Sequence, residues 1–345
     1  MVSAAIIGVG TACPGVLHQD ALWDGFFRAH YGGSALARRL WFRSGVQTRH
    51  GVVDPRDEDL STWGTAARMR RFVAEAVPLG KAAVSGCLAD AKRGPADVDL
   101  LAVVTCTGYA TPGLDVLLAR DLGMRRDVQR LAVGHMGCYA ALPGLAAVAD
   151  AAVARGRVAV LLCLELTSLH IQPPTTDVDQ IVSHALFSDA AAAIMVAPAA
   201  PGLHVVDVVA RTDTLCAELM TWDVTDNGFR MGLSPQVPRV LDRHVAEVVG
   251  DLLADHGLEV SDVAGWAIHP GGPRIVDVVA RRLGLGEAQV AVSRQVLRDH
   301  GNCSSATVPL ILERLRPRLR DGDHVACLAF GPGLTLYAAL LRAAM

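Results

Sequence analysis

The stretch VAGWAIHPG at residues 263–271 repeats, late in the chain, the pattern of LLAVVTCTG at residues 100–108. Each is a short apolar run that ends in a turn of glycine, proline or small polar residues. Each then continues into a helical pattern rich in Val, Leu, Ala and Arg. Apolar strands that alternate with such helices are typical of layered α/β folds. The two stretches therefore predict a strand, a turn and a helix in each half of the chain, with the helices ending near Leu122 and Leu283.

The segments that follow these helices correspond in the same order. After the first helix we expect a strand, a helix that opens at Cys138, and a strand over residues 158–162. After the second we expect a strand near residues 291–292, a helix that follows Asn302, and a strand over residues 324–328. Any α/β protein repeats strand, turn and helix, but the matching order of turn chemistry favours an internal duplication. A duplicated unit would place Cys138 and Asn302 at equivalent helix starts, facing one seam.

Length and composition agree with a large duplicated unit. The 345 residues are 51% hydrophobic and 5% aromatic, which favours tightly packed α/β layers over a disordered chain. We predict two related halves, residues 1–205 and 206–345. The net charge of −3 argues against nucleic acid or an anionic membrane as the main partner.

The cysteine pattern and the first residues indicate the cellular setting. The eight cysteines are scattered without a Cys-x-x-Cys pair, which argues against a zinc site or a disulfide framework and suits a reducing cytoplasm. The start MVSAAIIGVG lacks the basic segment of a signal peptide and predicts a strand and a turn. The apolar stretch over residues 140–164 is interrupted by Asp150, Arg155 and Arg157, so we expect no membrane span.

Three polar side chains of a catalytic type, Cys138, His269 and Asn302, each lie in a turn of glycine, proline or other small residues. Backbone N–H groups at a helix start favour negative charge, so a thiol at position 138 is easier to ionise. Taken singly, each residue has an ordinary alternative: a core cysteine, a hydrogen-bonded loop histidine and a turn asparagine. Together the three residue types form a set suited to thioester chemistry.

With these motifs the chain resembles the type III polyketide synthases, the chalcone-synthase-like branch of the thiolase-fold condensing enzymes. The most specific matches are HPGGP at residues 269–273 and FGPGLT at residues 330–335. The others are Gly137-Cys138, Gly301-Asn302 with SSA at 304–306, Thr107-Gly108 with Pro112-Gly113, and ALF at 185–187 with Asp189. Ketoacyl synthases of fatty acid initiation are similar around Cys, His and Asn, but normally differ in the His turn and the C-terminal Gly-rich strand. The resemblance implies a thiolase-like, five-layer αβαβα fold built from two duplicated halves.

The resemblance also implies a role for each of the three polar residues. Cys138 would be a thiolate that accepts an acyl group from coenzyme A. His269 would stabilise that thiolate as an imidazolium and later polarise a thioester carbonyl, and Asn302 would donate a second hydrogen bond to the same oxygen. Decarboxylation of malonyl-CoA creates an enolate, so two fixed donors at its oxygen stabilise the developing charge. The substrates are coenzyme A thioesters, and no metal or redox cofactor is implied.

Further positions match the family's gates and cavity. Phe187 corresponds to a phenylalanine where the coenzyme A tunnel meets the cavity, and Met231 falls at a second gate that is often Phe, which makes that gate more adaptable here. Ordinary packing is the alternative for each position that resembles the cavity lining: Cys106, Thr167, His170, Ser183, Trp222 and Ser304. Trp222 and His170 are bulkier than the residues usual in plant members, so the plant product range is not expected.

Two arginines, Arg39 and Arg43, match family basic residues that meet the coenzyme A phosphates. A guanidinium suits phosphate chemically, whereas a solvated basic face is the alternative. The family's further upstream lysine is replaced by Leu36 here.

The resulting hypothesis is a cytoplasmic, homodimeric acyltransferase. It would load an acyl-CoA starter on Cys138, extend it by repeated decarboxylative Claisen condensation with malonyl-CoA, and cyclise the chain to a small aromatic or pyrone. One alternative is a ketoacyl-synthase-III-like enzyme that performs a single condensation or acyl transfer. Another is a non-catalytic acyl-CoA-binding relative, whose expected mark would be a lost Cys, His or Asn.

Overall fold

The computed structural model describes residues 3–344. Its main strands are hydrogen-bonded in the order β11-β12-β13-β8-β1-β7-β6-β4-β5. The first half of the chain contributes β1 (Ala4–Ala12), β4 (Leu100–Thr105), β5 (Gln129–Gly134), β6 (Ala159–Glu165) and β7 (Ala190–Pro198). The second half contributes β8 (Gly202–Thr212), β11 (Val263–Ile268), β12 (His324–Gly331) and β13 (Thr335–Ala344).

The two halves repeat the same strand topology. In the first half β1 is antiparallel to β7, β7 is antiparallel to β6, and β6 is parallel to β4. In the second half β8 is antiparallel to β13, β13 is antiparallel to β12, and β12 is parallel to β11. The halves meet where β1 pairs with β8 at Ala5–His204 and Ile6–Leu203. This correspondence agrees with the predicted duplication.

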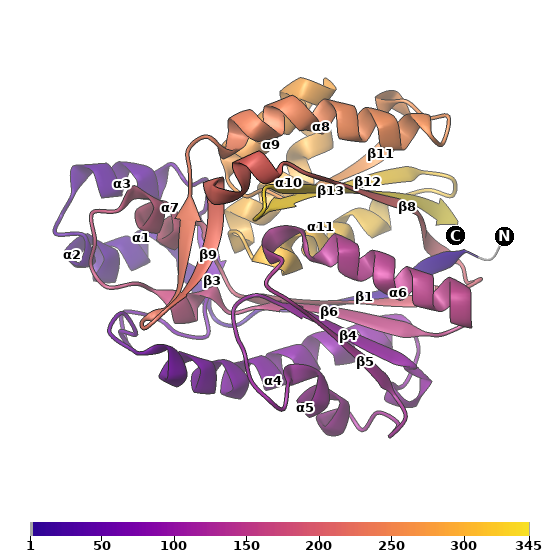
Figure 1. Ribbon diagram of the computed structural model, residues 1–345, viewed down its shortest axis with the longest axis horizontal. Helices are drawn as coiled ribbons and strands as arrows, with labels where there is room; N and C mark the ends of the chain where they lie inside the picture. The colour runs from indigo at the N-terminus through magenta and orange to yellow at the C-terminus, as the bar shows by residue number, and fades with distance from the viewer. Residues whose placement is uncertain (1–2, 345) are drawn as a thin grey trace.

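Five layers follow from the burial of both faces of each half-sheet (Figure 1). On β4, Leu101 and Val103 pack on one side with α4 (Thr65–Asp90) and α5 (Leu114–Asp121). Ala102 and Val104 pack on the other side, in a core that includes α6 (Ala141–Arg155) and α11 (Thr307–Leu315). The second half-sheet covers that middle layer and carries α8 (Val237–Ala254) and α9 (Pro273–Leu283) on its outer face. Strands buried on both faces read as continuous apolar runs, as these do.

One predicted strand is wrong. Residues 291–292 lie inside α10 (Glu287–His300), so the second half has a helix where the first half has β5. The buried residues Val290, Ser293 and Leu297 recur at helical spacing, and the side chain of Gln289 caps the helix start by accepting from the Gly286 N–H at 2.8 Å. A short apolar run between polar residues does not by itself separate a strand from a helix.

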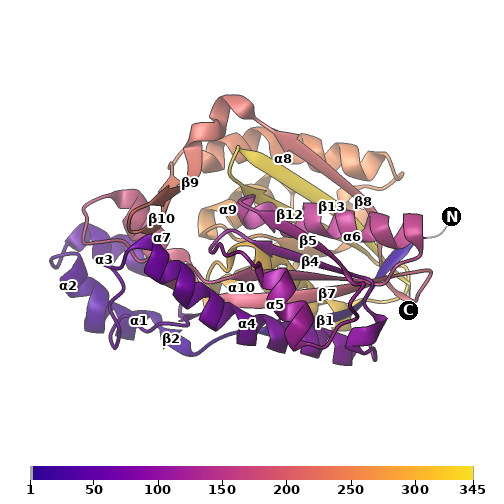
Figure 2. The same ribbon diagram turned by 60° about the horizontal axis from the view of Figure 1, so that its bottom comes forward.

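Smaller elements gather at one end of the molecule (Figures 1 and 2). They are β2 (Val16–His18), α1 (Gln19–Leu22), a π-helical turn at Trp23–Phe27, α2 (Arg28–His30), α3 (Ala35–Phe42), β3 (Thr48–His50), α7 (Val178–Leu186), and the hairpin of β9 (Met220–Thr225) and β10 (Gly228–Leu233). An aromatic cluster holds α1, α3 and α7 together, with Trp23, Phe27 and Trp41 buried at its centre. Of these elements, α3, α7 and the hairpin of β9 and β10 line the cavity described below.

Two helical segments, Thr65–Asp90 and Gly137–Arg155, are long and apolar enough to cross a membrane by length and composition. Both are layers of the folded core. The first is α4, which packs on the outer face of the first half-sheet, and the second contains α6 of the middle layer. Packing in the fold therefore accounts for their apolar composition.

Candidate active site

A cavity of about 290 Å³ brings together the three candidate catalytic residues, Cys138, His269 and Asn302, from distant parts of the sequence. Each lies just beyond the end of a strand or helix of the duplicated core. The predicted convergence at the seam of the two halves is therefore present in the structure.

Cys138 lies in a 3₁₀ turn (Gly137–Tyr139) that leads directly into α6. The turn requires glycine at position 137, where φ is 77° and an added Cβ would lie 2.7 Å from the Cδ of Pro332. Pro332 belongs to the FGPGLT segment, so this C-terminal motif packs directly against the turn that holds Cys138. The thiol is 6% exposed.

His269 follows β11 and has its backbone N–H bonded to the carbonyl of Leu328 at 2.8 Å. The side chain is buried, yet among residues 3–344 neither ring nitrogen has a hydrogen-bond partner. Buried polar atoms are normally paired, and exceptions require an explanation. The unpaired imidazole lines the cavity, where a bound molecule would supply the missing partner.

Asn302 is held in one orientation by its neighbours. Its Oδ1 accepts from the backbone N–H of Ser304 at 2.9 Å, so the amide nitrogen is the end left to donate. Its backbone N–H donates to the Leu186 carbonyl at 2.8 Å, and its carbonyl accepts from the Ser188 N–H at 3.0 Å. The asparagine is therefore locked before any substrate binds.

Burial dominates the electrostatics of the site. It raises the pKa of the Cys138 thiol to about 12, although hydrogen bonds from Ser304 and Asn302 to the sulfur act in the opposite direction. Burial also lowers the pKa of His269 to about 3. Both shifts favour a neutral thiol beside a neutral imidazole. The position of Cys138 at a helix start favours the thiolate, but removal of the sulfur from water has the larger effect on its pKa.

A buried carboxylate that was not predicted from the sequence, Glu165, lies close to the cysteine. It accepts from the hydroxyls of Thr107 and Ser305 at 2.8 and 2.5 Å and from the backbone N–H of Cys106 at 3.0 Å. Burial raises its pKa. The signal in the sequence was a lone charged residue at the end of the otherwise apolar strand β6. Two predicted lining residues, Cys106 and Ser304, lie in this network, with the Cys106 sulfur 3.6 Å from the Ser304 hydroxyl.

The two predicted gate residues, Phe187 and Met231, border two cavities at once. Both line the main cavity, and both also line a smaller one of about 50 Å³. The smaller cavity contains four further residues that were predicted to line the substrate space: Thr167, His170, Ser183 and Trp222. These four therefore lie beyond the gate pair as seen from Cys138.

Hydrogen bonds fix the bulky wall of the small cavity. The Trp222 indole N–H donates to the Cys106 carbonyl at 2.7 Å. His170 donates from Nε2 to the Thr107 carbonyl at 2.7 Å and accepts at Nδ1 from the Phe229 N–H at 3.0 Å. Burial lowers the pKa of His170 to about 4, so its ring is neutral and serves to hold the hairpin.

The two candidate phosphate-binding arginines differ in position. Arg43 follows α3 and lines both the main cavity and an open hollow on the outside of the protein. Arg39 lines only the outer hollow and does not reach the main cavity. Within residues 3–344 neither guanidinium forms an ion pair with a carboxylate of the chain. The mouth of the cavity thus carries unpaired positive charge.

Comparison with known proteins identifies the family of the chain. Residues 2–201 match the N-terminal domain of the chalcone and stilbene synthases, and residues 208–345 match their C-terminal domain. The chain is 32% identical over 314 residues to the alpha-pyrone synthesis polyketide synthase-like Pks18 of Mycobacterium tuberculosis, covering 86% of this chain and 80% of that protein. It is 34% identical over 319 residues to the 1,3,6,8-tetrahydroxynaphthalene synthase of Streptomyces peucetius, covering 89% and 84%.

Solved structures share the whole fold. PKS-I of the brown alga Ectocarpus siliculosus superposes with a TM-score of 0.92 at 28% identity and covers 99% of both chains. The type III polyketide synthase domain of Steely1 from Dictyostelium superposes with a TM-score of 0.93 at 25% identity, covering 99% of this chain and all of that one. These matches and the two family domains, which together span nearly the entire chain, show that the protein belongs to the chalcone and stilbene synthase family and is a type III polyketide synthase.

Proposed function

We propose that this polyketide synthase loads its starter on Cys138, extends it with malonyl-CoA, and releases a small aromatic or pyrone. The observation that carries the proposal is one cavity lined by a buried thiol, an unpaired imidazole and an asparagine whose oxygen is already engaged, so that its amide nitrogen is the donor on the cavity side. Coenzyme A thioesters are the substrates of the family, and mostly apolar side chains line the cavity that contains Cys138.

In the proposed loading step, the Cys138 sulfur attacks the thioester carbonyl and forms a new C–S bond. Because both side chains favour their neutral forms, the thiol proton passes to an unpaired nitrogen of His269 as the sulfur attacks. The bond to coenzyme A then breaks, and the imidazolium returns the proton to the departing thiolate. The acyl group stays on Cys138.

In the proposed extension step, a malonyl-CoA loses carbon dioxide and leaves an enolate at its thioester oxygen. His269 and the Asn302 amide nitrogen donate to that oxygen. Donors that are already fixed stabilise the charge without reorganisation, and Asn302 is fixed by Ser304. The enolate carbon then attacks the acyl carbon on Cys138, and the bond from that carbon to sulfur breaks. The chain, two carbons longer, is now carried by coenzyme A, and the departing Cys138 thiolate takes up a proton from solvent before the next loading step.

We infer that the gate residues and the two arginines at the mouth of the cavity act in substrate entry. Phe187 and Met231 stand between the catalytic cavity and the smaller cavity, so their side chains are placed to control passage between the two. Arg39 and Arg43, unpaired at the mouth, are suited to the phosphates of coenzyme A. Leu36 leaves that site with one cation fewer than the family pattern.

A homodimer in the cytoplasm completes the proposal. Strand β5 is one of the two edges of the nine-stranded sheet, and its residues 129–132 are exposed. Leu131 on this strand is 37% exposed, and the nearby Tyr109 is 66% exposed. An exposed edge strand with apolar side chains is a template for pairing with another chain. A second copy would cover it.

Incubation of the purified protein with malonyl-CoA and a panel of acyl-CoA starters, with mass analysis of the products, tests the function. Products with several added two-carbon units support the proposal. One added unit would support the ketoacyl-synthase-III-like alternative, and absence of turnover would support an acyl-CoA-binding relative. The family matches and the presence of all three polar residues favour neither alternative.

A further inference from the structure

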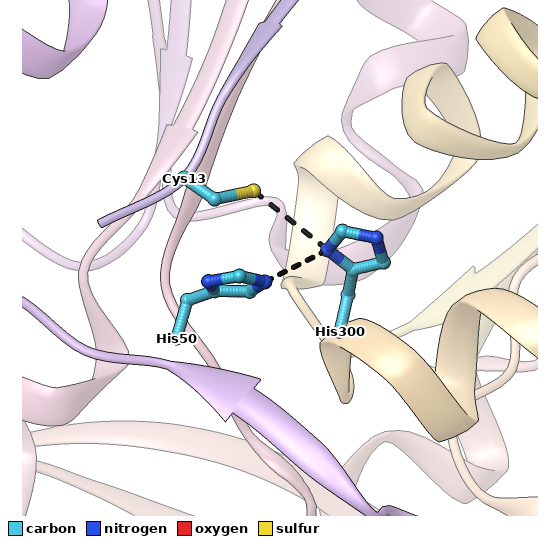
Figure 3. A group of neighbouring side chains, drawn as sticks. All are labelled: Cys13, His50 and His300. Atoms are coloured by element: carbon cyan, nitrogen blue, oxygen red, sulfur yellow. Dashed lines mark hydrogen bonds between the residues drawn. The ribbon is translucent and has the colours of Figure 1, made fainter. Parts of the chain in front are cut away.

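Cys13, His50 and His300 meet at a point that the polyketide chemistry does not use (Figure 3). Cys13 follows β1, His50 ends β3, and His300 ends α10, so the two halves of the chain both contribute. The ligand atoms of the three side chains all lie within 4.8 Å of one another. The sequence contains no Cys-x-x-Cys pair, and residues as far apart as these three carry no spacing pattern that predicts a metal site.

We propose that Cys13, His50 and His300 form a site for a divalent cation of borderline softness, with Zn²⁺ as the best-matched ion. One thiolate and two imidazoles suit zinc, whereas magnesium and calcium prefer oxygen ligands. Three protein ligands leave a fourth position for water. Cys13 and His300 are half-buried, so an ion can reach the group from solvent.

The distances already approach those of a tetrahedral zinc centre. Bonds of about 2.3 Å to sulfur and about 2.0 Å to nitrogen separate neighbouring ligands by about 3.5 Å for S···N and about 3.3 Å for N···N. The Cys13 sulfur lies 3.7 Å from His300 Nδ1, and His50 Nε2 lies 3.0 Å from the same nitrogen. The Cys13 sulfur and the ligand nitrogen of His50 lie within 4.8 Å of each other. Closing this third separation to about 3.5 Å takes a shift of at most about 1.3 Å, which rotation of the side chains can supply.

A backbone carbonyl orients the His50 ring for metal binding. His50 Nδ1 lies 3.0 Å from the Pro14 carbonyl, which can only accept, so Nδ1 carries the hydrogen and Nε2 presents a lone pair. A histidine whose other nitrogen donates to a backbone carbonyl is the usual arrangement of a metal ligand. The His50 backbone is held as well, because its N–H donates to the Ser188 hydroxyl at 2.8 Å.

His300 must change its tautomer before it can bind a metal through Nδ1. Arg314 donates to His300 Nε2 at 2.6 Å, so in the metal-free chain the hydrogen of this ring lies on Nδ1 and joins a chain toward His50. Metal binding moves that hydrogen to Nε2 and turns Arg314 toward Asp299, which is 3.6 Å from its other terminal nitrogen. The Cys13 thiol loses its proton to solvent. Burial raises the pKa of Cys13 to about 11, so zinc affinity should rise with pH.

Occupancy would tie the two halves of the chain together beside the active site. His300 is separated from Asn302 by Gly301 alone, and the His50 carbonyl accepts from the Asp189 N–H at 3.0 Å on the segment that follows Phe187. An ion that binds the folded state and not the unfolded chain stabilises the fold by mass action. We therefore expect Zn²⁺ to raise the melting temperature.

The test uses full-length protein that carries Cys138→Ala, because the catalytic thiol beside His269 is a competing metal site. After treatment with a chelator, the protein is titrated with Co²⁺ and then Zn²⁺. Bound zinc is measured by elemental analysis. The same titrations are made on this protein with Cys13→Ser, with His300→Gln, and with Cys216→Ser as the matched control, since Cys13 and Cys216 are the two half-buried cysteines.

We expect one equivalent of zinc, a thiolate-to-cobalt charge-transfer band that zinc removes, and the same results for the Cys216→Ser control. The band should vanish in Cys13→Ser. Zinc affinity should fall by more than about 100-fold in Cys13→Ser and His300→Gln, and the zinc-induced rise in melting temperature should vanish with it. If His300→Gln does not fold, Cys13→Ser decides alone. Substoichiometric zinc, an adventitious ion only, or a band that survives in Cys13→Ser would overturn the site and leave a hydrogen-bond chain.

Discussion

Phe187 and Asn302 are paired backbone to backbone in a parallel β-bridge. The Asn302 N–H bonds the carbonyl before Phe187, and the Asn302 carbonyl bonds the N–H after it. Arg49, itself buried, donates to the Phe187 carbonyl at 3.0 Å. The gate residue and the proposed oxyanion donor thus share one rigid backbone unit. A change in the position of either backbone is transmitted to the other.

Replacement of the nucleophile should stop acyl transfer and leave the fold intact. Cys138→Ala removes the attacking sulfur and demands no new backbone conformation, because the strained position in the turn is Gly137. Mass spectrometry after incubation with an acyl-CoA starter should show an adduct on the wild type and none on the variant. Formation of an adduct on Cys106 or Cys303 of the variant, at the wild-type rate, would contradict the assignment.

Loss of either oxyanion donor should slow decarboxylation of malonyl-CoA. His269→Ala and Asn302→Ala should each reduce carbon dioxide release by about 10²–10³-fold, because each removes one fixed donor. Asn302→Asp sharpens the test: it retains an oxygen for the Ser304 N–H but has no amide nitrogen to donate. Asn302→Asp should therefore be as slow as Asn302→Ala. Unimpaired release by these folded variants would place enolate stabilisation elsewhere.

The pH dependence of alkylation distinguishes a neutral pair from a resting ion pair. With the pKa of Cys138 raised to about 12 and that of His269 lowered to about 3, the thiol stays protonated and the ring neutral through the neutral range. The rate of modification by iodoacetamide should therefore rise about tenfold per pH unit from pH 7 to 10, since the thiolate fraction rises in that proportion. A rate that is already at a plateau at pH 7, and that falls in His269→Ala, would indicate a thiolate–imidazolium pair.

Cavity volume should control starter size and chain length. Trp222→Ala removes a large side chain from the wall of the small cavity, so the variant should accept longer acyl starters or release longer products. Trp222→Phe is the matched control, because it keeps most of the aromatic bulk and loses only the hydrogen bond to Cys106. Product profiles across short and long acyl-CoA starters provide the comparison. An unchanged profile in an active Trp222→Ala variant would make Trp222 a packing residue.

The exposed edge strand β5 should mediate dimer formation. Leu131→Arg places a charge on exposed β5 without disturbing the buried core, so it should weaken self-association and leave the melting profile of the monomer unchanged. Light scattering coupled to size exclusion measures the mass of each form. A monomeric wild type would contradict the proposed dimer, and a variant that dimerises as tightly as the wild type would place the interface elsewhere.

The amino-acid sequence determined the repeated α/β order and the identity of the three polar residues. Strand β4 and its repeat β11 are nearly continuous apolar runs that end in turn residues, a pattern that local chemistry fixes. The HPGGP and FGPGLT segments identified the family because backbone turns of that kind tolerate few other residues. The prediction of a strand at residues 291–292 was wrong because the periodicity of so short a run does not distinguish a strand from a helix. In the structure these residues belong to α10, which buries one face against β11.

Only the tertiary structure determined the charge state of the catalytic cysteine and which side chains from distant segments lie together. The position of Cys138 at a helix start argues for a thiolate, but the depth of the cavity sets the cost of charging the sulfur and raises its pKa. The orientation of the Asn302 amide depends on the Ser304 N–H. The placement of Trp222 and His170 beyond the gate depends on their hydrogen bonds to the turn that follows β4. The meeting of Cys13, His50 and His300 depends on the docking of α10 against β3. Such contacts arise from packing between segments far apart in the chain, for which the sequence carries no local signal.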